Sequence, residues 1–410
     1  MIRAIRVLML FAVIPAAHAE RKYLLSFSSD VLTGGTNQIG TSSYFLGSVS
    51  KGLSPFYGAY PTVNLKSVGR RSTLDVTYTF TFDRYEMETV ATTLGHNFRS
   101  EFNSQLSRTL RFRMNGTFTT TPQVSTVNVL TGISLNPLGD FNYIFEPQLL
   151  DNIYKHATAG IGLDLDLGKT SFLSFSASGG LTRYDADARA SFGLLSNQTR
   201  LEGSLSYNYR KSQHQTWGIK YTAYENFFRA YGNVRSHSAS ITYSRELSPS
   251  LHVNLAAGPS FTEKTRTQPE YFGYTASIDI SKTIRTNLIS LRYNHRSGDS
   301  TGYGGATDSH QAGIGFSRAI GKRVTLRVDA FASEQKQRVS SAFKQRSISG
   351  SAALSRAVGK HWQVSLGASY QDYPSESSVI FPYPSYPGRV NRRVYLSIGY
   401  RMPEMWRVAK

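Results

Sequence analysis

Residues 309–332, SHQAGIGFSRAIGKRVTLRVDAFA, decide the fold. Apolar side chains alternate with small or polar ones on both sides of a short charged segment, 321–323. The apolar members are Ala312, Ile314 and Phe316 before this segment, and Val324, Leu326, Val328 and Ala330 after it. A period of two places one class of side chain on each face of a strand. The stretch therefore predicts a β-hairpin with a tight, charged turn.

A five-residue pattern in this hairpin recurs along the chain: an apolar residue, Ser, Arg or Lys, any residue, then an aliphatic residue. It occupies 243–247, 280–284, 316–320 and 354–358, with an earlier copy at 106–110. The serines at 244, 281, 317 and 355 follow one another at 37, 36 and 38 residues. A fixed period indicates a series of like units. Two strands of about ten residues, a short turn and a longer loop would fill each one, as in a bilayer-spanning hairpin.

The first nineteen residues are typical of a secretory signal peptide. Arg3 and Arg6 precede the apolar segment 7–17, and Ala17 and Ala19 form a small-x-small cleavage site. The chain contains no cysteine, which excludes disulfides and thiolate metal sites and suits an oxidising periplasm. We therefore expect an exported protein.

The chain is basic, with 46 Lys and Arg against 27 Asp and Glu. A soluble protein of this charge would suggest nucleic acid as a partner, but export argues against it. Anionic lipid headgroups, phosphorylated glycolipid or an anionic solute remain as partners.

Alternating segments fit either a soluble sandwich or a closed membrane barrel, and four features favour the barrel. Tyr and Trp occur at strand ends, turns are short on one side only, a signal peptide delivers the chain, and the second face of each strand is small and polar. The prediction is an all-β fold, an antiparallel up-and-down transmembrane β-barrel of about 16–18 strands. It would occupy 56–402, after the signal peptide 1–19 and an N-terminal lead 20–55, a first strand or small hatch, and before an extension at 403–410.

The final alternating segment, 395–402 or YLSIGYRM, resembles the last strand of Gram-negative outer-membrane β-barrel proteins. The resemblance covers most of 62–402, with a weaker likeness to barrels associated with exopolysaccharide export. It departs from that pattern at Met402, where an aromatic residue is usual. It implies an outer-membrane location and, as partners, outer-membrane lipid, lipopolysaccharide, the barrel-assembly machinery and polysaccharide-export components.

Alternation also assigns candidate site residues. The candidate lumen-lining side chains are Arg111, Arg113, Arg292, Arg327, Asp329 and Arg401, with Arg393 in the same phase. The candidate membrane-interface side chains are Arg245, Lys282, Arg318, Arg356, Trp217, Trp362 and Tyr400. The lumen arginines either favour anions or pair with inward aspartates. The repeated basic residues either reach headgroup phosphates or are ordinary charged strand ends.

The long connection 119–155 either folds inward as a constriction, with Asp140, Glu146 and Asp151 facing the arginines, or forms an extracellular cap. No catalytic motif or metal-ligand spacing occurs, so we expect no enzyme activity and no cofactor. The function predicted is a porin-like outer-membrane channel for passive diffusion of small hydrophilic solutes. The alternatives are an exopolysaccharide export or secretion barrel, and a structural or adhesive barrel with a plugged lumen.

Overall fold

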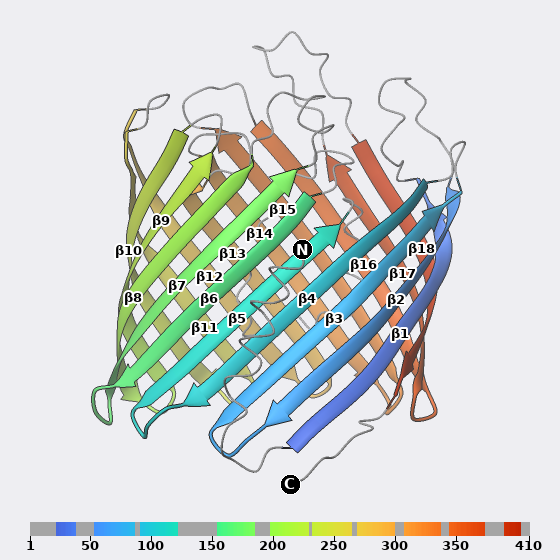
Figure 1. Cartoon of the computed structure of the whole chain (residues 1–410), viewed down its shortest axis with the longest axis horizontal. Helices are drawn as coiled ribbons and strands as arrows, with labels where there is room; N and C mark the ends of the chain where they lie inside the picture. The colour runs from blue at the N-terminus through green and yellow to red at the C-terminus, as the bar shows by residue number, and fades with distance from the viewer. Residues whose placement is uncertain are drawn as a thin grey trace.

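In the computed structural model, the strands run obliquely around a central lumen and close into a barrel (Figure 1). The structure describes residues 22–37, 53–86, 91–121, 154–184, 197–228, 232–264, 269–299, 307–337, 344–373 and 389–402. The predicted signal peptide, the extension at 403–410 and most of the 119–155 connection lie outside these residues. Within them, no helix is both long and apolar enough to cross a membrane.

Eighteen strands make up the described sheet. Their bounds are β1 Lys22–Thr36, β2 Ser54–Val68, β3 Ser72–Tyr85, β4 Ala91–Gln105, β5 Leu110–Thr121, β6 Tyr154–Asp166, β7 Ser171–Tyr184, β8 Gln198–Ser212, β9 Gln215–Phe228, β10 Gly232–Ser248, β11 Leu251–Thr262, β12 Tyr271–Ile284, β13 Asn287–Asp299, β14 Thr307–Ile320, β15 Val324–Gln337, β16 Lys344–Val358, β17 Trp362–Tyr373 and β18 Arg389–Arg401.

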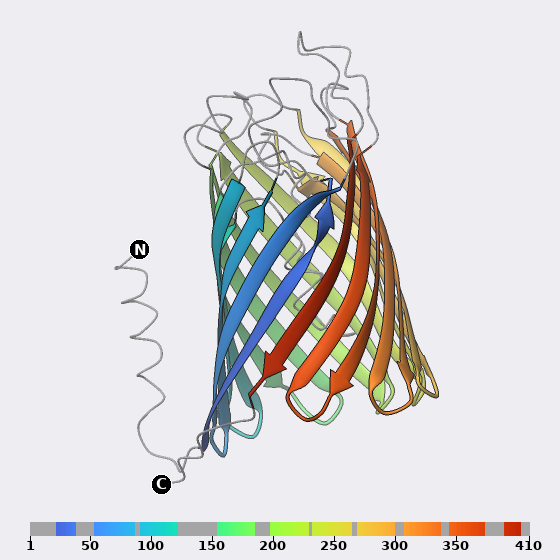
Figure 2. The same cartoon turned by 90° about the vertical axis from the view of Figure 1, so that its right-hand side faces the viewer.

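Each strand pairs antiparallel with the next in sequence, and β1 also pairs with β18 to close the barrel. Figure 2 shows the first strand in blue beside the last strand in red. The predicted all-β antiparallel barrel and its strand number are confirmed. Because β1 spans Lys22–Thr36, the barrel begins earlier than residue 56.

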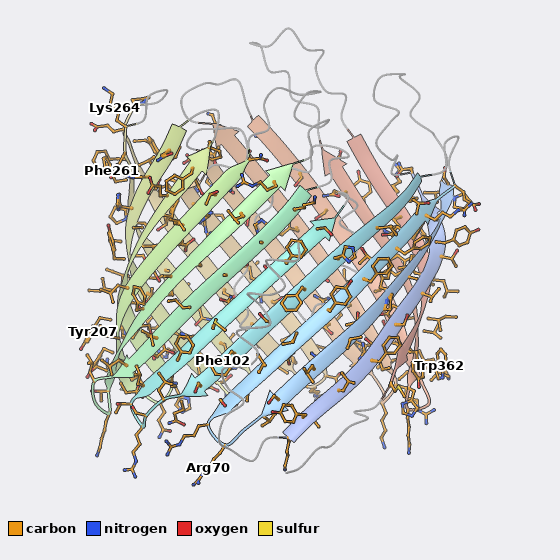
Figure 3. The ribbon with its side chains drawn as sticks, viewed as in Figure 1. Arg70, Phe102, Tyr207, Phe261, Lys264 and Trp362 are labelled. Carbon is orange, nitrogen blue, oxygen red and sulfur yellow. The ribbon has the colours of Figure 1, made fainter. Side chains whose placement is uncertain are left out.

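The side chains of each strand alternate between an exposed apolar face and an inward face. On β18, Val394, Leu396 and Ile398 are 43–46% exposed, whereas Arg393 and Tyr395 are 3% and 4% exposed. Figure 3 shows apolar side chains of this kind, Phe102, Tyr207, Phe261 and Trp362, on the outer surface. An apolar exterior on a closed barrel suits lipid, because no backbone edge is left unpaired there.

The two ends of the barrel differ in their connections. Eight turns of two to four residues join the strands at one end, while the connections at the other end run from 3 to 32 residues. Two of the short turns use a left-handed glycine, Gly321 with φ 66° and Gly359 with φ 71°. Four copies of the repeated pattern end strands beside these turns, but the copy at 106–110 forms a turn itself, where the Leu110 amide donates to Ser107 Oγ at 3.0 Å.

The seam, which we define as β18, β1 and β2, has a packed inner face. Leu32, Phe56, Tyr60 and Tyr395 point inward and are 0–4% exposed. Gly34 lies between Phe56 and Tyr395 in the strand register. The expectation that inward side chains are small and polar is therefore wrong at the seam, where the two ends of the chain meet.

Candidate functional site

The inward faces of β4–β8 form a charged wall. On β6, Ile161 and Leu165 are exposed on the outside, so Asp164 and Asp166 point inward. Arg111 lies opposite Asp164 in the register, which places the β5 arginines on the inward face as well. The inward direction of these side chains thus follows from alternation along each strand and from the strand register, because directly opposite residues share a face of the sheet.

Ion pairs connect the members of this wall. Arg113 pairs with Asp164 at 2.9 Å, and Ser174 donates to the same carboxylate at 2.7 Å. Arg111 and Arg210 both approach Asp166, each at 3.4 Å. The side chain of Arg113 is 57% exposed and that of Asp164 only 12% exposed. The guanidinium therefore extends toward solvent in the lumen, while the carboxylate stays against the wall.

Two further ion pairs belong to the charged wall and were missed by sequence reasoning. Arg99 approaches Glu101 at 3.5 Å, and Arg200 pairs with Glu202 at 2.8 Å. The guanidinium of Arg210 also lies 4.5 Å from the ring centroid of Phe172. The alternation along β8 could have identified Arg200 and Arg210 as inward residues, because leucines and tyrosines occupy the odd positions and are exposed on the outside.

The remaining lumen candidates lie apart from this wall. Arg292 approaches Asp279 at 3.4 Å across β12 and β13, and Arg327 pairs with Asp329 at 2.7 Å on β15. Arg401 lies at the end of β18 opposite Ser28. At the described inward positions of β14, β16 and β17 no side chain is charged. Serine, glycine, alanine, threonine and glutamine fill these positions. The adjacent strands β16 and β17 form a neutral wall, which lies seven to eight strands from β6 at the centre of the charged wall.

Arg393 is placed differently from the other inward arginines. Its guanidinium lies 3.7 Å from the ring centroid of Phe56 at the seam, and the residue as a whole is 3% exposed. None of its side-chain nitrogens has a hydrogen-bond partner among the described residues. Arg393 therefore belongs to the packed seam and does not line the lumen.

The candidate interface residues lie near the short turns on the outward face. Arg245, Lys282, Arg318 and Arg356 are exposed there. Their directly opposite neighbours include the aliphatic residues Val253, Ile289, Leu326 and Val364. Such cations extend over apolar surface at one depth of a barrel.

Aromatic residues cluster at the same depth. The rings of Trp217 and Tyr243 are 4.5 Å apart between centroids, and those of Trp362 and Tyr400 are 4.9 Å apart. Trp217 and Trp362 are 44% and 51% exposed, as residues facing a membrane–water boundary would be. In the described residues, no group of three or more His, Cys, Asp or Glu side chains is arranged to hold a metal ion.

The fold and its two faces define a class: a closed 18-stranded up-and-down barrel with an apolar exterior, the architecture of Gram-negative outer-membrane β-barrel proteins. No protein-family model matches the chain, and no curated protein matches its sequence.

Several solved structures are similar to the barrel. OccK2 (OpdF) of Pseudomonas aeruginosa is 9% identical, with 93% of this chain and 98% of that chain covered and a TM-score of 0.47. OccK7 (OpdD) of the same organism is 9% identical, with 94% and 100% covered and a TM-score of 0.46. The FrpB iron transporter from Neisseria meningitidis is 10% identical, with 92% and 81% covered and a TM-score of 0.45. At these values the fold assignment rests on the strand order and register of this chain.

Proposed function

We propose that this barrel is an outer-membrane channel through which small hydrophilic solutes diffuse passively. The observation that carries the proposal is the solvent exposure of inward charged side chains, 63% for Arg99 and 57% for Arg113. Charged side chains in a packed interior would be buried and paired, so this wall faces water. Barrels of 16 to 18 strands are wide enough for an aqueous channel.

We further propose that the lumen favours anions weakly. Arg113, Arg111 and Arg210 are more exposed than the aspartates with which they pair. A solute passing the charged wall would therefore meet guanidinium groups before it meets carboxylates. Lining charges tune selectivity in channels, and the pairing with aspartate limits the size of the preference.

The proposed orientation places the short turns in the periplasm and the long connections outside the cell, as in outer-membrane barrels. Arg70, in the short turn between β2 and β3, projects away from the barrel at this end (Figure 3). Delivery by the predicted signal peptide supports the same location.

Liposome swelling tests the proposal. Liposomes containing the folded barrel should swell in isotonic solutions of small uncharged sugars, with rates that fall as sugar size increases, because passage is by diffusion through a fixed lumen. Liposomes with a similar amount of heat-denatured protein are the control. Swelling no faster than this control, from protein shown to be folded by its gel mobility, would refute a diffusion channel.

A further inference from the structure

A polar row crosses the lipid-facing surface of β4–β7 at the end with the long connections. In the strand register His96 lies opposite Thr120, Thr120 opposite Lys155, and Lys155 opposite Arg183. Arg183 shares the outward phase of Leu181, which is 44% exposed, so the whole row faces outward. We call these four residues the basic row.

The basic row begins where the apolar surface ends. Two residues closer to the short turns on each strand, the outward positions are Phe98, Phe118, Ala157 and Leu181, which also lie opposite one another. The outer surface therefore changes from apolar to basic within two residues along each strand. In a membrane barrel such a step marks the boundary between hydrocarbon and lipid headgroups.

Two cations of this row, Lys155 and Arg183, lie directly opposite each other. Both are exposed, and such an arrangement destabilises a sheet unless an anion lies between the charges. Neither forms an ion pair with any described residue.

On the corresponding surface of β9–β11, the basic side chains lie beside carboxylates. Arg235 lies 2.9 Å from Glu225 and 4.0 Å from Glu263, and His237 Nε2 lies 3.0 Å from Glu263. Arg235 therefore differs from Lys155 and Arg183, which have no acidic partner within the part of the chain that the structure describes.

We propose that the basic row binds a phosphorylated glycolipid of the outer leaflet through its phosphate groups. Lysine and arginine are the side chains that bind phosphate best, and the hydroxyl of Thr120 and the ring of His96 extend the polar surface beside them. The ring of His96 forms a hydrogen bond between its Nδ1 and Tyr78 Oη, at 2.8 Å. The row covers three interstrand spacings, about 14 Å, which exceeds one phosphate and suits a headgroup of sugars and phosphates. This inference rests on the proposed outer-membrane orientation.

Lipid binding to the full-length folded barrel in neutral detergent tests the inference, with native mass spectrometry as the readout. The probes are bis-phosphorylated lipid A, the same lipid after dephosphorylation, and phosphatidylglycerol. The wild-type barrel should bind the bis-phosphorylated form most tightly. K155A and R183A should each weaken this binding about fivefold, since one cation near an anionic headgroup region contributes about that factor. The double variant should weaken it roughly 25-fold, while R235A, whose cation is already paired, should match wild type.

Equal binding of the phosphorylated and dephosphorylated lipids would overturn the inference, as would unchanged binding in K155A/R183A. Phosphatidylglycerol binding as tightly as lipid A would overturn the assignment to a glycolipid. Gel mobility before and after heating checks that each variant is folded. Liposome swelling by the same double variant separates the two proposals, because the basic row lies outside the lumen and its loss should leave swelling unchanged.

Discussion

The seam and the charged wall are both inner surfaces of one barrel, yet they have opposite characters. At the seam Phe56 and Tyr60 are 0% and 1% exposed and pack against neighbouring strands. At the charged wall Arg113 is 57% exposed. Both sets of side chains follow the same inward phase of alternation. The difference teaches that alternation determines which way a side chain points, while its polarity and the space beside it determine whether it packs against neighbouring strands or extends away from the wall.

Glycines make the packed seam possible. A Cβ atom at Gly34 would collide with the carbonyl oxygen of Val394, and one at Gly367 would collide with the ring of Tyr395. Gly34 therefore lets β1 approach the backbone of β18, and Gly367 leaves room for the inward ring of Tyr395. The charged wall needs no such arrangement, since its long side chains extend into solvent.

The largest effect should come from breaking the seam. Gly34→Ala would force β1 away from β18, at a cost of about 1–3 kcal/mol or more from overpacking against backbone. We expect a lower yield of heat-modifiable, folded barrel on gels and a lower urea midpoint of unfolding. The matched control is Gly203→Ala on β8, where nothing lies within 4 Å of the new atom. Equal folding of the two variants would contradict the close contact at the seam.

The next effect concerns the charged wall. R111E/R113E replaces two guanidinium groups with carboxylates, so the weak anion preference should become a cation preference. The sign of the reversal potential in a salt gradient measures this change. R70E/R71E is the control, because it makes the same change of charge in an exposed turn. A reversal potential that stays at the wild-type value in R111E/R113E would place these arginines outside the conduction path.

A smaller effect is expected from Asp164→Asn. The substitution removes the carboxylate 2.9 Å from Arg113 and leaves the guanidinium uncompensated. The reversal potential should therefore shift further toward anions. Stability should change by about 0–1 kcal/mol, because the guanidinium of Arg113 can be solvated in the lumen and the new amide oxygen can still accept the hydrogen bond from Ser174. A shift toward cations would show that the carboxylate does not reduce the field of this arginine.

The smallest effect should come from the neutral wall. Ser365→Ala on β17 removes a hydroxyl from an inward position without changing charge, and the residues opposite it, Ser355 and Ser397, are neutral. Selectivity should remain at the wild-type value within error, measured in the same salt gradient. A change as large as that of Asp164→Asn would show that the neutral wall contributes to selectivity and would weaken the contrast between the two walls.

Much of the barrel could be predicted from the sequence, because period-two alternation reports directly on strand faces. It predicted the hairpin of β14 and β15, in which Ile314 lies opposite Ala330. It also assigned Arg111 and Arg113 to the inward face, where they pair with Asp166 and Asp164. Alternation needs only a sequence window, so local pattern was sufficient for these elements.

The seam could not be predicted in this way. On β1, Leu24 and Leu32 occupy the inward phase, so apolar residues fall on both faces and the alternation disappears. The cause is packing between strands far apart in sequence: Leu32 lies opposite Gly58 and Ser397. The register between β6 and β7 likewise places Lys155 opposite Arg183, and the composition of the sequence does not reveal this register.

Single-channel recording in planar lipid bilayers tests the central claim most directly. The folded barrel should insert as a stable open conductance that increases with salt concentration, because charged side chains such as Arg113 stand in solvent along its wall. Failure of heat-modifiable, membrane-inserted barrel to conduct ions would contradict the claim that the lumen is an aqueous channel.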